Sequence, residues 1–383
     1  MKKGLYIVLF GLCTLLSMRV MTISAQAEEI SQYTFVLNQK GTGYELQKFN
    51  PFVLVIDTGG ADYEVKDYDY YAALIAKQTD KTKAIVPDTY KGKPVTSIGD
   101  LAFFGCVYLE SIELPESVVR IGDQAFSGCE KLKKINIPKK LTYLGKGAFY
   151  SCKALETTIV LPNSLKKIED TTFGYCFELK KVTLPKKLKS IGIAAFEKCG
   201  SLTEIKLPES VTSLGNNVFQ ECSSLTAIQL PSKLKKIPNL AFAECGALEE
   251  ILIPKTVNKI GYAAFSNCDA LKEVTIPKGV TVLEAQTFNG CNSLEAVELP
   301  SKLTTIGGAC FNHCESLTSL TIPETVMSIE LDAIRNCKNL TWVELCGKPK
   351  KVDKSNYGLD IFRGIYSRTW EEAQNGKKFK RNN

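Results

Sequence analysis

Cysteines recur at a nearly constant interval through most of the chain, and this period constrains the fold more than any other feature. They stand at positions 106, 129, 152, 176, 199, 222, 245, 268, 291, 314 and 337, so that every interval is 23 residues except one of 24. A phenylalanine lies three residues before each of the first ten cysteines, and Ile334 takes this place in the last unit. Self-similarity at this period is typical of a stacked solenoid and excludes a set of unrelated globular domains.

Each unit can be read as one coil of backbone, as the segment from Leu202 to Ser224 illustrates. The alternation Ile205-Lys206-Leu207 predicts a short strand whose apolar side chains face inward, ended by a proline that cannot donate a ladder hydrogen bond. A second inward-facing turn follows, with a glycine that allows a sharp bend. The helical spacing of the apolar residues around Phe219 and Cys222 then predicts a short helix or 3-10 turn. Stacked units would align their strands in a parallel sheet.

The repeating pattern Leu-x-x-Ile-x-Leu-Pro-x-x-Val-x-x-Ile-Gly-x-x-Ala-Phe-x-x-Cys resembles the 23-residue leucine-rich repeat of BspA-like bacterial surface proteins. The segment 85–99 resembles the repeat with which such arrays usually open, and the likeness covers residues 84–346. The resemblance implies an α/β solenoid, a right-handed leucine-rich-repeat array of about eleven coils with a cap at each end. It also implies a secreted or surface-exposed interaction protein involved in adhesion, and it carries no catalytic residues.

The first 27 residues have the pattern of a secretory signal peptide. Lys2 and Lys3 precede an apolar run, and Ala25-Gln26-Ala27 supplies small residues at a cleavage position. A membrane anchor and lipid attachment at Cys13 are the weaker alternatives, because the run is shorter than a membrane span and the residues before Cys13 form a poor lipidation motif. No later stretch could span a membrane. We therefore predict a secreted, periplasmic or cell-surface protein.

The segments flanking the repeats lack the period. Residues 28–83 include Tyr33 to Leu37 and Tyr44 to Phe49 around a glycine-rich turn, which predicts a hairpin in a β-rich N-terminal cap. Residues 347–383 read as a C-terminal cap with a frayed basic tail. The 24-residue interval adds one residue at Thr157 and Thr158, which should interrupt the sheet locally.

The composition weakens most catalytic and metal-binding hypotheses. His313 is the only histidine, so sites that depend on imidazole are improbable. A column of parallel cysteines does not converge on one metal ion, and buried free cysteine behaves as a small apolar residue. We predict no metal and no cofactor. A disulfide from Cys310 or Cys346 to Cys314 or Cys337 stays open as an alternative.

The outward positions of the predicted strands form one continuous face. Glu250 and Glu273 are neighbours on it, and Val160, Leu252 and Trp342 are apolar residues exposed among polar ones. Two adjacent carboxylates would suit a retaining glycosidase, but no motif supplies a pocket or further polar groups. Exposed apolar residues among short polar ones favour a binding surface for a partner.

Lysines gather after the strand-ending prolines and would stack into a basic ridge. Its members include Lys186, Lys187, Lys235, Lys236 and Lys255. Cleavage after Ala27 removes three of the 48 basic residues and none of the 41 acidic ones, which leaves a net charge of +4. This nearly balanced charge, without aromatic residues between the lysines, does not favour binding to nucleic acid. The ridge could instead attract acidic glycans or anionic proteins.

We therefore predict a non-enzymatic protein that binds an extracellular protein or glycan through its repeat surface. The alternatives are a periplasmic carbohydrate-binding protein and, less favoured, a glycan-active enzyme. The sequence does not specify the ligand, the oligomeric state or the mode of retention at a surface.

Overall fold

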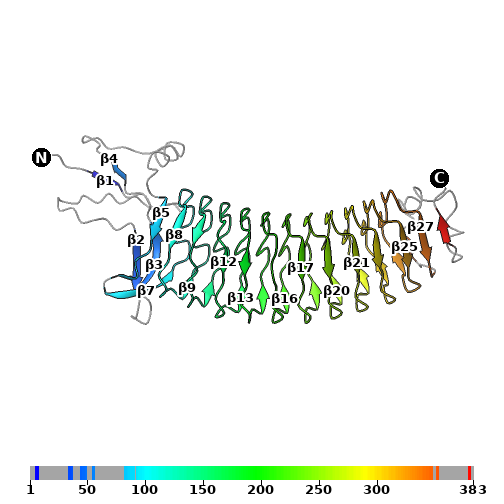
Figure 1. Ribbon diagram of the computed structural model, residues 1–383, viewed down its shortest axis with the longest axis horizontal. Coiled ribbons are helices and arrows are strands. Elements are labelled where there is room, and N and C mark those ends of the chain that lie inside the picture. Colours follow the sequence, from blue (N-terminus) through cyan, green and yellow to red (C-terminus); the bar gives the residue numbers. More distant parts are fainter. Residues whose placement is uncertain are drawn as a thin grey trace.

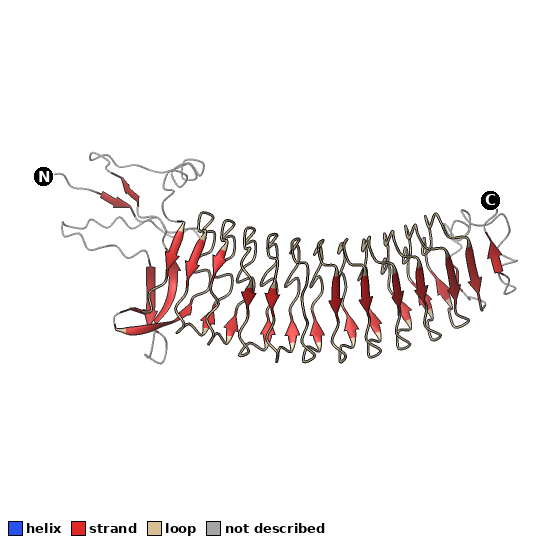
Figure 2. Cartoon of the chain, in the orientation of Figure 1, coloured by secondary structure: helices blue, strands red, loops and turns tan. Residues whose placement is uncertain are grey.

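The computed structural model describes residues 82–90 and 92–347 and, outside them, only the short strands at 5–7, 33–37, 44–49, 54–56, 351–352 and 378–380. Successive coils lie side by side in a gently curved row (Figure 1). Two rows of short strands run along this array (Figure 2). The predicted solenoid of about eleven coils with parallel strands is confirmed.

The first row, here called the first ladder, contains the strand that the sequence predicts in every unit except residues 202–224, where Ile205-Lys206-Leu207 forms no named strand. Its strands pair in parallel within several short sheets, and Glu204 bridges Lys181 and Ala227 where a coil has no named strand. The strands are β5 (Lys83–Ile85), β8 (Ser111–Glu113), β10 (Lys134–Ile135), β12 (Ile159–Val160), β14 (Val182–Thr183), β17 (Ala227–Gln229), β19 (Glu250–Leu252), β21 (Glu273–Thr275), β23 (Ala296–Glu298), β25 (Ser319–Ile322) and β27 (Trp342–Leu345).

A second ladder runs where the sequence predicts only a turn. Apart from the last, its two-residue strands end on the inward Ile or Leu before the glycine position, and all of them pair in parallel. They are β9 (Arg120–Ile121), β11 (Tyr143–Leu144), β13 (Lys167–Ile168), β15 (Ser190–Ile191), β16 (Ser213–Leu214), β18 (Lys236–Ile237), β20 (Lys259–Ile260), β22 (Val282–Leu283), β24 (Thr305–Ile306), β26 (Ser328–Ile329) and β28 (Lys351–Val352), preceded by β7 (Lys93–Ile98). Two residues are too few to show a strand period, so only the stacking of coils reveals these strands.

The segment around each phenylalanine is a string of turns, and residues 82–90 and 92–347 contain no helix. The predicted short helical or 3-10 turns are therefore not found. In one coil the N–H groups of Gln124, Phe126 and Gly128 donate to carbonyls of the next coil at 2.7–2.8 Å, and the residues between them donate three positions back. Gln124 and Gly128 have φ angles of 53° and 74°, and the same two positions are left-handed in every coil from 101 to 336. A helix needs consecutive right-handed residues, so this alternation excludes one.

The core is a set of parallel columns of identical side chains. Phenylalanine rings stack from Phe103 to Phe311, with centroids of neighbouring rings 4.9–5.7 Å apart. Beside them, each cysteine Sγ from Cys129 to Cys337 donates to the phenylalanine carbonyl of the preceding coil at 3.1–3.2 Å. The cysteines therefore pack as small buried residues. Cys310 is a buried free thiol and Cys346 an exposed one, so neither forms the alternative disulfide.

The glycine that follows the second ladder serves close packing between coils. A Cβ added to Gly215 would lie 2.4 Å from the backbone nitrogen of Ile193 in the preceding coil, and its φ is not left-handed. The prediction that glycine occupies this position because it allows a sharp bend is therefore wrong. The close approach of two backbones is the physical reason.

The array is extended at both ends by strands outside the repeat. At the start, β2 (Tyr33–Leu37) and β3 (Tyr44–Phe49) form the predicted antiparallel hairpin, and β3 pairs in parallel with β7. At the end, β29 (Lys378–Lys380) pairs antiparallel with β27. The prediction of a frayed tail is wrong for these three residues. The remaining strands are β1 (Leu5–Ile7), which pairs with β4 (Leu54–Ile56), and β6 (Thr89–Tyr90), which pairs with β7.

The first ladder has a break at the one-residue insertion, where the sequence predicts an interruption, but it also breaks between β19 and β21 and between β23 and β25, where the interval is 23 residues. The break is therefore not specific to the insertion. The N–H groups of Glu156 and Thr157 both point to the carbonyl of Lys133, at 3.4 and 3.3 Å. The strands on either side, β10 and β12, belong to different sheets.

In the part of the chain that the structure describes, no helix has the length and apolar character of a membrane span.

Candidate binding groove

The outward side of the first ladder forms an open groove across β14 to β23, with a volume of about 1720 Å³. Most coils supply their two outward strand positions and the position after the strand-ending proline. The polar residues that line the groove are Lys181, Thr183, Lys186, Glu204, Lys206, Glu209, Thr226, Gln229, Glu250, Lys255, Glu273, Thr275, Lys278, Glu298 and Ser301.

Strand alternation decides which side chains reach the groove. In β19, Ile251 packs into the core with 7% of its surface exposed, whereas Leu252 beside it is 80% exposed. Among the large apolar residues that the structure describes as exposed, Leu252 has the greatest exposure. An apolar side chain held in this way by a rigid strand is a contact that a partner could cover.

Several charges in the groove are already satisfied within the molecule. The Lys181 Nζ lies 2.6 Å from the Glu204 Oε1, and this hydrogen bond lowers the pKa of Glu204. The Glu209 carboxylate accepts hydrogen bonds from the hydroxyl and N–H of Ser232 at 2.7 and 3.0 Å, which lowers the pKa of Glu209.

Seven charged side chains in the groove have no side-chain partner in the described part of the chain: Lys186, Lys206, Glu250, Lys255, Glu273, Lys278 and Glu298. Glu250, Glu273, Lys255 and Lys278 are exposed and make no side-chain hydrogen bond or ion pair with any residue in the described part of the chain. They lie in two adjacent coils, with both carboxylates on the first outward strand position and both ammonium groups after the prolines.

The groove brings together some of the predicted site residues and separates others. Glu250, Leu252, Glu273 and Lys186 all line it. The remaining five lie elsewhere. Val160 on β12 is 58% exposed, and Lys187 and Lys235 are exposed but do not line the groove. Lys236 belongs to β18 of the second ladder, and Trp342 is on β27, with a side chain outside the described set.

The predicted basic ridge is therefore divided between two surfaces. Sequence reasoning missed Lys278 as a site residue. The available signal was its position, because Lys278 follows Pro277 as Lys186 follows Pro185 and Lys255 follows Pro254. Among the described residues, no group of three or more His, Cys, Asp or Glu side chains could hold a metal ion.

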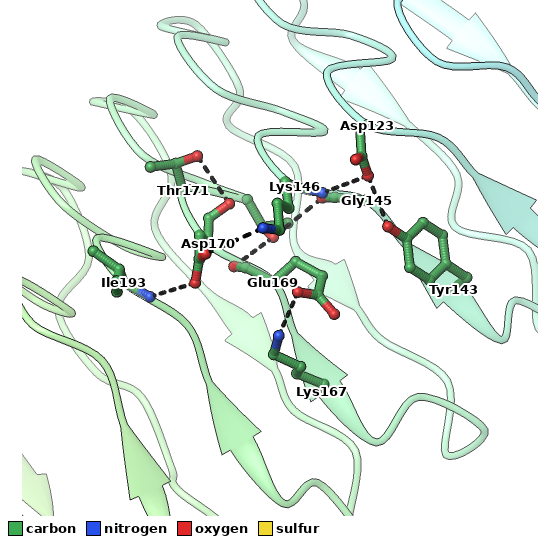
Figure 3. Close-up of polar contacts among 10 residues, drawn as sticks. Asp123, Tyr143, Gly145, Lys146, Lys167, Glu169, Asp170, Thr171 and Ile193 are labelled. Carbon is green, nitrogen blue, oxygen red and sulfur yellow. Dashed lines mark hydrogen bonds and ion pairs between the residues drawn. The ribbon is translucent and has the colours of Figure 1, made fainter.

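A second polar cluster lies beside the second ladder (Figure 3). The Asp123 carboxylate accepts the Tyr143 hydroxyl at 2.7 Å and the N–H of Lys146 at 3.0 Å. Asp170 in turn accepts the N–H of Ile193 at 2.9 Å, so an acidic side chain bonds the backbone of the next coil in both cases. Burial, with the hydrogen bond to Asp123, raises the pKa of Tyr143 to about 12. These side chains form hydrogen bonds between neighbouring coils, so the cluster stabilises the fold.

Solved structures of bacterial repeat proteins resemble this chain. A leucine-rich cell surface protein from Faecalibacterium prausnitzii is 24% identical, with 91% of this chain and all of that chain covered and a TM-score of 0.48. A leucine-rich repeat protein from Bacteroides ovatus is 26% identical over 85% of this chain and 90% of that chain, with a TM-score of 0.46. The pneumococcal vaccine antigen PcpA is 21% identical over 81% of this chain and 84% of that chain, with a TM-score of 0.51, a likeness in fold.

A comparison with curated protein sequences finds no match. A family model described as the BspA type leucine rich repeat region matches six copies, over residues 86–160, 157–272 and 235–358. The matched ranges cover the two ladders, the phenylalanine column and the groove. This chain belongs to the BspA-type leucine-rich-repeat family.

Proposed function

We propose that this protein is a secreted or surface-exposed, non-enzymatic interaction protein that binds an extracellular protein or glycan through the groove over β14 to β23. One observation carries the proposal: the groove is open, and a rigid array of strands holds Leu252 and several unpaired charges on its surface, among them Glu250 and Lys255. An open site with an exposed apolar residue and free charges suits recognition of a large partner.

The binding test uses purified protein against arrays of extracellular-matrix proteins and of glycans. We expect binding to at least one class of probe and its loss in the variant Leu252→Ala/Glu250→Gln/Lys255→Gln. The matched control is Lys235→Glu/Lys236→Glu, which changes exposed charges outside the groove. Loss of binding only in this control would show that the binding site lies on the basic ridge. Absence of binding to either array would contradict the proposal.

Export is tested separately. If residues 1–27 are a signal peptide, the mature protein begins at Glu28, and protease added to intact cells should cleave the protein. N-terminal sequencing of the recovered protein checks the first point. Detection of an uncleaved, protease-protected chain would contradict export.

A further inference from the structure

The groove is bipolar at its centre. Glu250 and Glu273 occupy the same position on β19 and β21, and Lys255 and Lys278 occupy the same position after the prolines of those coils. Leu252 and Thr275 lie between the two pairs. Two like charges therefore stack on each side of the groove, with opposite signs across it.

None of these four side chains makes an ion pair within the described residues, although Glu249 and Lys272 beside them in the same two coils pair with each other. Within the described residues, ion pairs join neighbouring coils at many places, among them Lys181 with Glu204 at 2.6 Å and Lys272 with Glu249 at 3.3 Å. At the groove centre, stacking instead places like charges about 5 Å apart, the spacing of adjacent strands. Such pairs repel, so an opposite charge from a ligand would be favoured on each side.

The charge pattern discriminates between classes of ligand. A polyanion, such as an acidic glycan, would meet the two lysines but would be repelled by the two glutamates. A neutral glycan would leave all four charges without a counter-charge. A polypeptide can carry a basic, an apolar and an acidic side chain along one short segment, and it satisfies both sides and Leu252 together.

We infer that the groove at β19 and β21 binds an extended polypeptide that presents a basic side chain to Glu250 and Glu273, an apolar side chain to Leu252, and an acidic side chain to Lys255 and Lys278. This inference rests on the proposed function and specifies its ligand. Alternate side chains of an extended chain lie roughly 6.6 Å apart on one face, and the same rise separates Glu250 from Leu252. The expected ligand pattern is therefore basic-x-apolar-x-acidic, in either chain direction.

The test uses immobilised peptides with the core Lys-Thr-Leu-Thr-Glu, matched peptides with Lys or Glu at both ends, and heparin. At low salt we expect the mixed peptide to bind at least fivefold more tightly than either like-charged peptide and than heparin. Added salt should weaken this binding, because the contacts are exposed ion pairs.

Charge-reversal variants locate the binding. Glu250→Lys/Glu273→Lys and Lys255→Glu/Lys278→Glu should each reduce affinity for the mixed peptide about tenfold. Combining all four changes should restore it, since the inverted groove accepts the peptide in the opposite direction. The control Lys235→Glu/Lys236→Glu should bind as the unaltered protein does.

Two results would overturn the inference. One is equal or tighter binding of heparin or a like-charged peptide, and the other is failure of the fourfold variant to recover. If a glycan binds the groove in the array experiment while the mixed peptide does not, the inference falls and the proposed function stands. Absence of any binding to arrays and peptides contradicts both.

Discussion

At the scale of single residues, the phenylalanine column has the largest expected effect on stability. Phe219 is fully buried between the rings of Phe196 and Phe242. We expect Phe219→Ala to lower the free energy of unfolding by about 3–5 kcal/mol, because it leaves a cavity between two coils. Leu252→Ala is the control, with an expected change within about 0.5 kcal/mol. Urea unfolding followed by circular dichroism measures both, and equal effects would contradict the assignment of these two environments.

The buried thiols make the protein sensitive to alkaline pH. Burial raises the pKa of Cys245 and Cys291 to about 12, whereas an exposed thiol in the unfolded chain titrates near 8.5, an approximate reference value. Because the folded pKa is the higher one, these thiols contribute fully to stability below the unfolded value. The contribution is lost as the pH rises toward the folded value.

We therefore expect the unfolding free energy of the unaltered protein to fall more steeply above about pH 9 than that of Cys245→Ala/Cys291→Ala. The double variant starts from a lower stability at pH 7, because it loses buried atoms. Parallel pH profiles for the unaltered protein and the double variant would show that these thiols do not titrate on unfolding.

At the scale of elements, the spacing between coils depends on the glycine after the second ladder. We expect Gly215→Ala to cost about 1–3 kcal/mol, because its Cβ would overlap the backbone of the preceding coil and force two coils apart. Gly246 is the matched control, since a Cβ there has its nearest neighbour at 4.0 Å. Gly246→Ala should leave the thermal melting temperature unchanged or raise it slightly. A similar loss in both variants would contradict the close-approach explanation.

At the scale of the whole molecule, each coil contacts only its neighbours, so the array should tolerate removal of one complete unit. Deleting residues 109–131 joins Tyr108 to Leu132, which occupies the same place in its coil as Leu109. We expect a folded, slightly shorter solenoid with a moderately lower melting temperature. Deleting residues 109–119 should instead abolish cooperative unfolding, because the columns lose register. Circular dichroism and thermal unfolding distinguish the two deletion variants, and equal tolerance of both deletions would contradict the importance of register.

The sequence alone was sufficient for the solenoid, the first ladder and the inward columns. A strict period repeats the same local preferences in every coil, so one unit's pattern predicts them all. The sequence also predicted that Glu250, Leu252 and Glu273 share an outward face. Each of these predictions follows from residue identity and alternation within a single coil.

The tertiary structure decided what depends on contacts between coils. The second ladder and the left-handed turns around Phe126 arise because backbone N–H groups donate to the next coil, a pairing that no local pattern records. Stacking also determined that Lys186 and Lys278 join the groove while Lys236 lies on the second ladder. The same stacking decided which charges stayed unpaired, because most ion pairs, such as Lys181 with Glu204, join residues of neighbouring coils.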